Sequence, residues 1–571
     1  MATISVPIGE RQTQSMPHWT EYFRWTVDHK IIGVQYGVTA FVFFLVGGAL
    51  AMLIRWELLT PALDTMASGT AYNQLFTIHG TIMIFLFVIP MWGAFGNYLI
   101  PLQLGAGDMA FPWLNAFAFW LIPPAGILVI MGYFVGQAEA GWTAYPPLST
   151  LFSGDGQTLW AMGAHLLGFS SILGSINFLV TILNMRPEGM SIWKMPLFCW
   201  AQMATSTIAV MATPFLAGAL TLMLLDRVGG TSFFDATQGG DVLLWQNVFW
   251  FYSHPAVYIM ILPGMGVLSE VLSVHSRKPI FGYRMIGLSS MAIAIVGFFV
   301  WAHHMFTSLQ PELRIPFMVT TMIIAVPTGI KIFSWIGTLW GGKIRFTSAM
   351  LFSLGFLSMF VIGGISGVML AAIPFNYQVH DTYFVVSHFH FVLFGGAVFA
   401  IYSGLYHWFP KVTGRMMNET LGRIHFVLTY LGFFFTFFPM HMAGMLGMPR
   451  RVAVYAPELQ TWNVIISIFS FILGISTFVF VGNAIWSVAR GRRAGANPWR
   501  ALTLEWATTS PPPAWNFDEP PIPFEDPYGY GTDAATAYLD AIDRTFGVPE
   551  PPRPNITGGN TPEALPSPAG D

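Results

Sequence analysis

The sequence is poor in cysteine and in charge, and both shortages exclude whole classes of protein. Its single cysteine, Cys199, rules out a disulfide, a two-cysteine copper site and a CxxCH haem attachment within this chain. We expect the Cys199 thiol to be a small buried apolar group. Charged residues make up 9% of the chain, against about 25% in an ordinary soluble domain. The net charge of −3 gives no indication of nucleic-acid binding.

Apolar residues are abundant instead: 54% of the chain is hydrophobic and 16% is aromatic. A transmembrane helix needs about 20 mostly apolar residues. We therefore predict an all-α polytopic membrane protein with twelve transmembrane helices. The apolar runs that predict them cover residues 31–54, 75–99, 112–136, 158–184, 198–225, 243–272, 284–307, 315–340, 347–373, 384–409, 421–445 and 461–490.

The distribution of lysine and arginine predicts the orientation of these helices, because basic residues favour cytoplasmic loops. Residues 1–30 are polar and show no cleavable signal pattern, so we expect a cytoplasmic N-terminal segment ahead of the core at 31–490. Residues 491–571 form a Pro-rich tail that we expect to pack under the helices on the cytoplasmic side, with its last twenty or so residues disordered. The outward-facing loops hold only a few basic residues, namely Arg55, Arg227, Arg314, Arg450 and Arg451.

Histidines gather at one depth of the predicted membrane layer. A single membrane histidine is more often a hydrogen-bonded core residue than a ligand, but several at one depth reverse that expectation, because neutral imidazole is a common ligand of haem iron and copper. The histidines that fall in the outer half of four predicted helices are His79, His254, His303, His304, His388 and His390.

The spacing of these histidines predicts three separate metal sites. His388 and His390 are two residues apart on a helix, so they point to opposite sides and can each hold a different metal. His303 and His304 are adjacent and could converge on one ion after a local distortion, with His254 as the third ligand. The resulting scheme has a bis-His haem at His79 and His390, a one-His haem at His388 and a three-His copper.

Six sequence motifs resemble subunit I of a bacterial haem–copper terminal oxidase of the cytochrome c oxidase type (aa3 or caa3). The motifs are "WFYSHPAVYIMILPG", "VWAHHMFT", "VPTGIKIFSW", "VHDTYFVVSHFHFVL", "GAGDMAFPWLN" and "GMPRR". They occur in the order typical of the family, and the similarity extends over roughly residues 20–490. The resemblance implies a catalytic subunit that reduces O2 to water and translocates protons across the membrane.

The resemblance also implies roles for the histidines and their neighbours. His79 and His390 resemble the ligands of a low-spin haem a, and His388 resembles the ligand of a high-spin haem a3. His254, His303 and His304 resemble the ligands of the copper called CuB. Tyr258 resembles the tyrosine cross-linked to the first of these, which supplies the fourth electron that O2 reduction needs.

Other residues resemble the periphery of these sites. Arg450 and Arg451 resemble the pair around the haem propionates, which guanidinium groups can bind in a bidentate manner. His380 and Asp381 resemble a Mg²⁺ site at the interface with subunit II. Arg55 resembles the arginine near the formyl group of the low-spin haem.

Two proton pathways are also implied. Lys331, with Thr328 on the same helix face, resembles the lysine pathway to the active-site tyrosine, and an intramembrane lysine is by itself a functional hypothesis. A second pathway would begin at Asp108. Its further polar positions are Asn97, Asn115, Ser170, Ser171 and Asn177.

The second pathway lacks the glutamate on which it ends in many relatives, because that position is Ala256 here. The "YSHPAVY" motif resembles a subclass in which Tyr252 and Ser253 take over the end of the pathway. Tyr252 lies four residues before Ala256 and can reach the same helix face. We expect these hydroxyl groups to relay protons by hydrogen bonding.

The expected partners follow from the resemblance and from what this chain lacks. They are a subunit II carrying the CuA site, subunit III and smaller subunits, membrane lipid, O2, and cytochrome c or a fused haem c domain as donor. A quinol donor and the haem type are left open by the sequence, although the subclass favours cytochrome c and A-type haems. The expected location is a bacterial plasma membrane, with a thylakoid membrane as the alternative in a cyanobacterium.

Two rival functions have distinct signatures. Nitric oxide reductase shares the histidine scaffold but uses non-haem iron with added glutamates, and it lacks the tyrosine one turn after the first histidine; Tyr258 argues against it. A transporter or channel without redox chemistry would explain twelve helices but not the layer of histidines.

Overall fold

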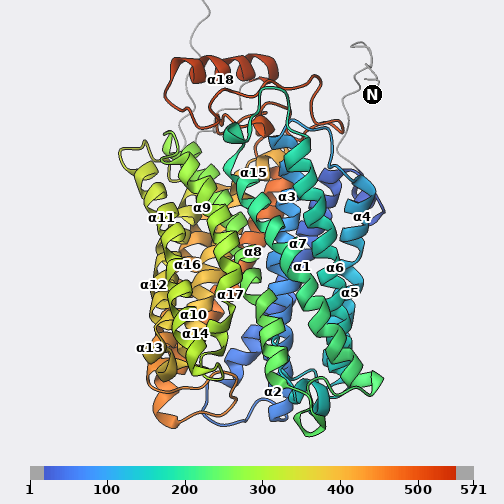
Figure 1. Cartoon of the computed structure of the whole chain (residues 1–571). Coiled ribbons are helices and arrows are strands. Elements are labelled where there is room, and N and C mark those ends of the chain that lie inside the picture. The colour runs from blue at the N-terminus through green and yellow to red at the C-terminus, as the bar shows by residue number, and fades with distance from the viewer. Residues whose placement is uncertain (1–17, 548–571) are drawn as a thin grey trace, which may run out of the picture.

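The protein is a bundle of long helices, and the computed structural model describes its residues 18–547 (Figure 1). No β-strand occurs in this range. The α-helices are α1 (His29–Glu57), α2 (Gly69–Thr81), α3 (Ile89–Gln103), α4 (Pro112–Trp120), α5 (Ile122–Val135), α6 (Asp155–Asn184), α7 (Leu197–Leu224), α8 (Val242–Ser276), α9 (Tyr283–Val296), α10 (Pro311–Ile323), α11 (Ala325–Leu339), α12 (Ser348–Ala371), α13 (Ile373–Val379), α14 (Tyr383–Val392), α15 (Phe399–Thr413), α16 (Glu419–Met445), α17 (Gln460–Arg490) and α18 (Asp533–Phe546).

Eleven helical segments in the described residues are long and apolar enough to cross a membrane, and one shorter apolar helix, Tyr283–Phe299, accompanies them. Several of the eleven combine two α-helices into one crossing. Gly69–Gln103 joins α2 to α3 through a π-helical stretch, and Tyr383–Thr413 joins α14 to α15 in the same way. The chain is therefore a multi-pass membrane protein, and its all-α fold agrees with the prediction from the sequence.

The predicted helix at 284–307 differs most from the structure. α9 ends at Val296, and tight 3-10 turns follow at Gly297–Phe299 and Trp301–Met305. A side chain at Gly297 would lie 2.8 Å from the ring of Tyr258, so the glycine allows a close approach at the break. The continuous α-helix expected there is wrong beyond Val296, and the break places His303 and His304 on a tight turn.

Small residues let the helices approach closely where hydrophobic driving force between them is weak. A Cβ atom on Gly444 of α16 would lie 2.0 Å from the backbone nitrogen of Phe384, at the start of α14. A Cβ atom on Gly432 would lie 2.9 Å from the backbone nitrogen of Leu473 in α17. Substitution at Gly444 would push α16 away from α14, which carries His388 and His390, and substitution at Gly432 would push it away from α17.

Residues 491–547 pack against one end of the bundle, which we call the inner end because the sequence predicts it to be cytoplasmic; α18 lies across this end (Figure 1). The side chain of Asn516 accepts from Lys30 Nζ at 2.9 Å and donates to Ala106 O at 2.8 Å. Tyr528 donates to the buried carboxylate of Glu270 at 2.6 Å. The helix α18 was not expected in this tail. The predicted disorder falls on residues outside the described range.

Candidate metal centre and proton routes

Three histidines from two separate elements converge near the outer end of the bundle. His254 lies in α8, while His303 and His304 lie on the 3-10 turn Trp301–Met305. Each offers one ring nitrogen, and these atoms all lie within 4.8 Å of one another. Among the described residues, this is the one group of three or more such side chains able to hold a metal ion, and it contains no carboxylate. The predicted local distortion at the adjacent histidines is present.

Neighbouring side chains fix the orientation of these rings. His254 Nδ1 lies 3.1 Å from His304 Nε2, and His303 Nδ1 lies 3.1 Å from the hydroxyl of Thr321. The indole of Trp250 stacks on His304, with ring centroids 3.7 Å apart. Sequence reasoning missed Trp250. The four-residue spacing of Trp250 and His254 could have predicted that they share one face of α8. The contact of Trp250 with His304 could not be predicted, because it depends on the tertiary fold.

Tyr258 lies beside the three histidines. Its ring centroid is 4.8 Å from that of His254, and the two rings meet nearly edge to face. The four-residue spacing on α8 places both on one helix face, as the sequence predicts. A phenol therefore borders the candidate copper site.

Backbone carbonyls hold the two histidines predicted to bind the low-spin haem. His79 Nδ1 lies 2.8 Å from Gly47 O, and His390 Nδ1 lies 2.8 Å from Val386 O. Each bond leaves Nε2 as the nitrogen free to act as a ligand. A π-helical stretch follows each histidine within three residues, at Ile82–Val88 and Leu393–Val398. Such stretches often occur at functional sites.

His388 points to the opposite side of α14 from His390. Its Nδ1 lies 3.0 Å from both Gly363 O and the Ser366 hydroxyl, on α12. His390 instead stacks on Phe437 of α16, with centroids 4.2 Å apart. The two histidines of α14 thus contact different helices, α12 and α16, as their spacing predicts.

The residues present fit the two haems and the copper that the sequence predicts. The side chains of His79, His388 and His390 are half-buried, and each engages a carbonyl oxygen through Nδ1, which leaves Nε2 to act as a ligand. Arg55 is buried, and its guanidinium donates to Asn463 and Ser467 at 2.9–3.1 Å. Arg55 Nη1 is a buried atom with no hydrogen-bond partner among the described residues, so it could meet a polar group on a haem.

The outer loops hold the predicted propionate and Mg²⁺ residues together. Arg450 forms an ion pair with Asp381, with Nε to Oδ1 at 2.7 Å, and His380 Nε2 lies 3.7 Å from Asp381 Oδ2. Burial raises the pKa of Asp381, but the charges of Arg450, His380 and Arg451 and the hydrogen bond from Arg450 together outweigh burial and lower that pKa. Arg451 lies over the ring of Phe76, and burial followed by repulsion from Arg450 lowers its pKa to about 10.

The residues of the predicted second proton pathway begin on the loop after α3. Burial raises the pKa of Asp108 to about 6, with Asp28 and Lys30 nearby. Asn177 accepts from Phe111 N at 2.9 Å, and Ser170 donates to Ala118 O at 2.7 Å; Ser171 is half-buried. These bonds tie α6 to the loop and to α4.

Several polar atoms of this group are buried without a partner among the described residues. They are the side-chain oxygen of Asn97, both polar side-chain atoms of Asn115 and the hydroxyl of Ser253. Tyr252 is also buried, and Ala256 beside it offers no polar group. Buried polar atoms of this kind are normally satisfied by ordered water. The arrangement is therefore suited to a hydrated path.

Lys331 is buried in α11 with 1% of its surface exposed. Its ammonium donates to Ser290 Oγ at 2.6 Å and to Ile286 O at 3.2 Å, both on α9. The hydroxyl of Thr328 bonds back to Ile324 O at 3.0 Å on its own helix. Ser290 was missed by sequence reasoning, because no spacing rule relates residues on different helices.

Comparison with known proteins identifies the family. Residues 31–472 match the model of the family described as "Cytochrome C and Quinol oxidase polypeptide I". The chain belongs to this family. The match covers all but the last of the predicted crossings and includes every histidine of the candidate site.

Individual relatives agree. The chain is 60% identical to "Cytochrome c oxidase subunit 1" of Synechocystis sp. over 528 residues, which is 92% of this chain and 96% of the relative. It is 56% identical to the protein of the same name from Thermostichus vulcanus over 517 residues, or 90% and 94% of the two chains. A solved haem–copper terminal oxidase dimer shares the fold, with a TM-score of 0.74 at 17% identity over 93% of this chain and 96% of that chain.

Membership of the oxidase family implies a haem and copper centre and association with other oxidase subunits. It rules out the transporter interpretation, which required a chain without redox chemistry. The absence of a carboxylate among the three converging histidines, together with Tyr258, also counts against nitric oxide reductase.

Replacement of His304 by alanine should remove copper selectively, because only two imidazoles would remain. We expect copper affinity to fall at least about tenfold, with the haem content unchanged. Elemental analysis of the purified complex against its haem absorbance measures both.

His165→Ala is the matched control, since His165 lies in α6 and its ring contact is with Phe169. Copper content equal to that of the parent protein in His304→Ala would show that His304 is not a ligand.

Proposed function

We propose that this chain is the catalytic subunit of a cytochrome c oxidase, which reduces O2 to water at a haem–copper centre and translocates protons across the membrane. The observation that carries the proposal is the convergence of His254, His303 and His304 beside Tyr258, without a carboxylate. The cytochrome c oxidase relatives, at 56–60% identity over nearly the whole chain, support it.

His79 and His390 would hold a low-spin haem a, His388 a high-spin haem a3, and the three converging histidines CuB. When bound, these groups supply electrons to O2. The chain keeps the imidazoles of His79, His388 and His390 in one orientation through Nδ1, which carbonyl oxygens engage. His380 and Asp381 would contribute to a Mg²⁺ site at the contact with subunit II, beside Arg450.

Tyr258 would supply the electron and the proton that the metals do not. Reduction of O2 to two water molecules consumes four electrons and four protons, and a phenol can deliver one of each. The edge-to-face contact with His254 at 4.8 Å is consistent with the covalent link between these two rings that the resemblance implies.

Two routes would deliver protons from the inner end. The first leads through Lys331 to Tyr258. The second begins at Asp108, whose pKa of about 6 lets it bind and release protons close to neutral pH. Asn97 and Asn115 with ordered water would continue it, and Tyr252 and Ser253 would end it where Ala256 replaces a carboxylate.

The electrons would come from cytochrome c, or a fused haem c domain, through a subunit II that carries CuA, because the single cysteine here cannot form that site. Subunit III and smaller subunits would complete the complex. The membrane would be a bacterial plasma membrane, or a thylakoid membrane in a cyanobacterium.

Turnover of the purified complex in sealed vesicles tests the function. We expect O2 consumption with reduced cytochrome c and release of protons on the side opposite the tail. Consumption supported by a quinol but not by cytochrome c would contradict the donor. No O2 consumption with either donor would contradict the function itself.

The combined substitution Tyr252→Phe and Ser253→Ala removes both hydroxyl groups at the end of the second route. We expect proton uptake and turnover to slow by roughly tenfold or more, because both hydroxyl groups of the proposed relay are lost and Ala256 offers no polar group in their place. Stopped-flow measurement of proton uptake with a pH dye, alongside steady-state turnover, gives the comparison.

Tyr430→Phe with Ser358→Ala is a matched control, since this hydroxyl pair, 3.3 Å apart, lies between α16 and α12. Unchanged uptake and pumping in the first double variant would show that Tyr252 and Ser253 are not part of the route.

A further inference from the structure

The contact between Lys331 and α9 has a defined hydrogen-bond direction. The Ser290 hydroxyl donates to Ile286 O at 3.1 Å, so its single proton is committed. The Ser290 oxygen therefore accepts from the Lys331 ammonium, at 2.6 Å. Lys331 Nζ also donates to Ile286 O at 3.2 Å, so both acceptors of this buried ammonium lie on one turn of α9.

The same face of α9 leads outward to Tyr258. Gly297 lies seven residues, or about two helical turns, after Ser290 and hence on the same face. A Cβ atom on Gly297 would lie 2.8 Å from Tyr258 Cδ2 and 3.0 Å from Cε2. Ser290 and the Tyr258 ring are thus on one side of α9, about 10 Å apart along the helix axis.

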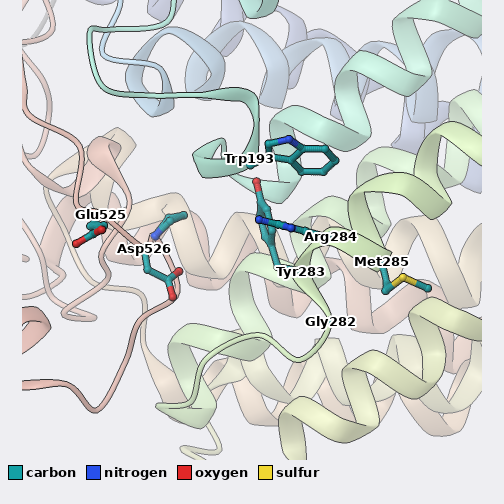
Figure 2. Close-up of a pocket in the computed structure, with 8 residues that line it drawn as sticks. Trp193, Gly282, Tyr283, Arg284, Met285, Glu525 and Asp526 are labelled. Atoms are coloured by element: carbon teal, nitrogen blue, oxygen red, sulfur yellow. The ribbon is translucent and has the colours of Figure 1, made fainter.

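In the inward direction, α9 leads to a pocket at the surface of the inner end. Ile286 N donates to Gly282 O at 3.0 Å, and a Cβ atom on Gly282 would lie 3.1 Å from the Ser334 hydroxyl, three residues after Lys331. Gly282 lines a pocket of about 400 Å³ together with Tyr283 and Arg284. In Figure 2, Glu525 and Asp526 of the tail lie on the other side of the pocket from Tyr283 and Arg284. One helical turn therefore separates the pocket from the carbonyl that holds Lys331.

We propose that Ser290 is a positioning residue for the lysine proton route, holding the Lys331 ammonium on the face of α9 that connects the inner pocket with Tyr258. The proposal rests on the role of Lys331 in the proposed function. A proton that arrives from the inner end converts the Lys331 amine to the ammonium. The ammonium then passes one proton toward Tyr258 and returns to the amine, while Ser290 keeps its own proton.

The chain offers a close control for this role. The neighbouring Ser289 hydroxyl is also buried and also donates to Ile286 O, at 2.9 Å, but it makes no hydrogen bond to Lys331. Loss of either serine removes one hydroxyl from the same turn of α9. Only loss of Ser290 removes an acceptor from the ammonium.

The test uses the complete oxidase carrying Ser290→Ala, Ser289→Ala, Ser290→Thr or Lys331→Met. Excess reductant is mixed with the oxidised enzyme in the absence of O2, and reduction of the high-spin haem is followed between pH 6 and 9. We expect Ser290→Ala to slow this reduction by about ten- to a hundredfold, the effect of losing a hydrogen bond to a charged group. Ser289→Ala should remain within about twofold of the parent, and Ser290→Thr should retain the rate.

The pH profile distinguishes positioning from a structural role. In Ser290→Ala the pH at which the rate has fallen by half should move to lower pH, because the lost acceptor favoured the charged amine. A parental rate and profile in Ser290→Ala, with Lys331→Met slow, would overturn the role of Ser290 and leave the lysine route standing. A parental rate in Lys331→Met would overturn the route itself. Equal losses in Ser289→Ala and Ser290→Ala would mean a structural effect on α9 and would also overturn the proposal.

If Ser290→Ala does not accumulate, Ser290→Thr and Ser290→Val decide the question, because these two side chains have nearly the same volume and differ in the hydroxyl. Slow haem reduction in Ser290→Val but not in Ser290→Thr supports the proposal. Equal rates in the two variants overturn it.

Discussion

The fixed direction of a few imidazole rings within an apolar bundle is the constraint on which the rest of the structure depends. A histidine that binds a metal through one nitrogen is normally held in its tautomer and orientation by a hydrogen bond to the other nitrogen, and backbone carbonyls of membrane helices are normally occupied within their own helix. Here carbonyls serve this purpose at Gly47, Gly363 and Val386, and they orient His79, His388 and His390. The helices that supply them must therefore keep their register, which explains the close packing of α16 against α14 at Gly444.

Some departures from regular α-helix lie beside the proposed ligands. π-helical stretches follow His79 and His390, and a 3-10 turn carries His303 and His304. A regular helix would point adjacent residues about 100° apart. On the turn after α9 the rings of His303 and His304 nevertheless lie 4.3 Å apart, where His254 can join them. The loss of regular hydrogen bonds at these points is tolerated because they are enclosed by other helices.

The sequence predicted what depends on composition and on spacing within one helix. It located the membrane crossings, grouped His254 with Tyr258, and separated His388 from His390. It could not predict contacts between helices that no spacing rule relates, such as Trp250 with His304 or Lys331 with Ser290. It also missed helix α18, because the proline-rich composition of the surrounding tail concealed a short amphipathic segment. The break after α9 was missed because residues 284–307 are mostly apolar and contain no proline to mark it.

The second proton route has no carboxylate at Ala256. In our proposal, buried hydroxyl and amide groups with ordered water carry protons there, and none of these groups needs to hold a charge. This chemistry matters only if the histidine layer holds the metals. The most direct measurement is the haem and metal content of the purified complex, by pyridine haemochrome and elemental analysis, after subtraction of metals on other subunits. Two A-type haems and one copper per copy of this chain are predicted. Additional non-haem iron without copper would contradict the copper site, and an intact protein without haem would contradict the metal-binding role of the whole layer.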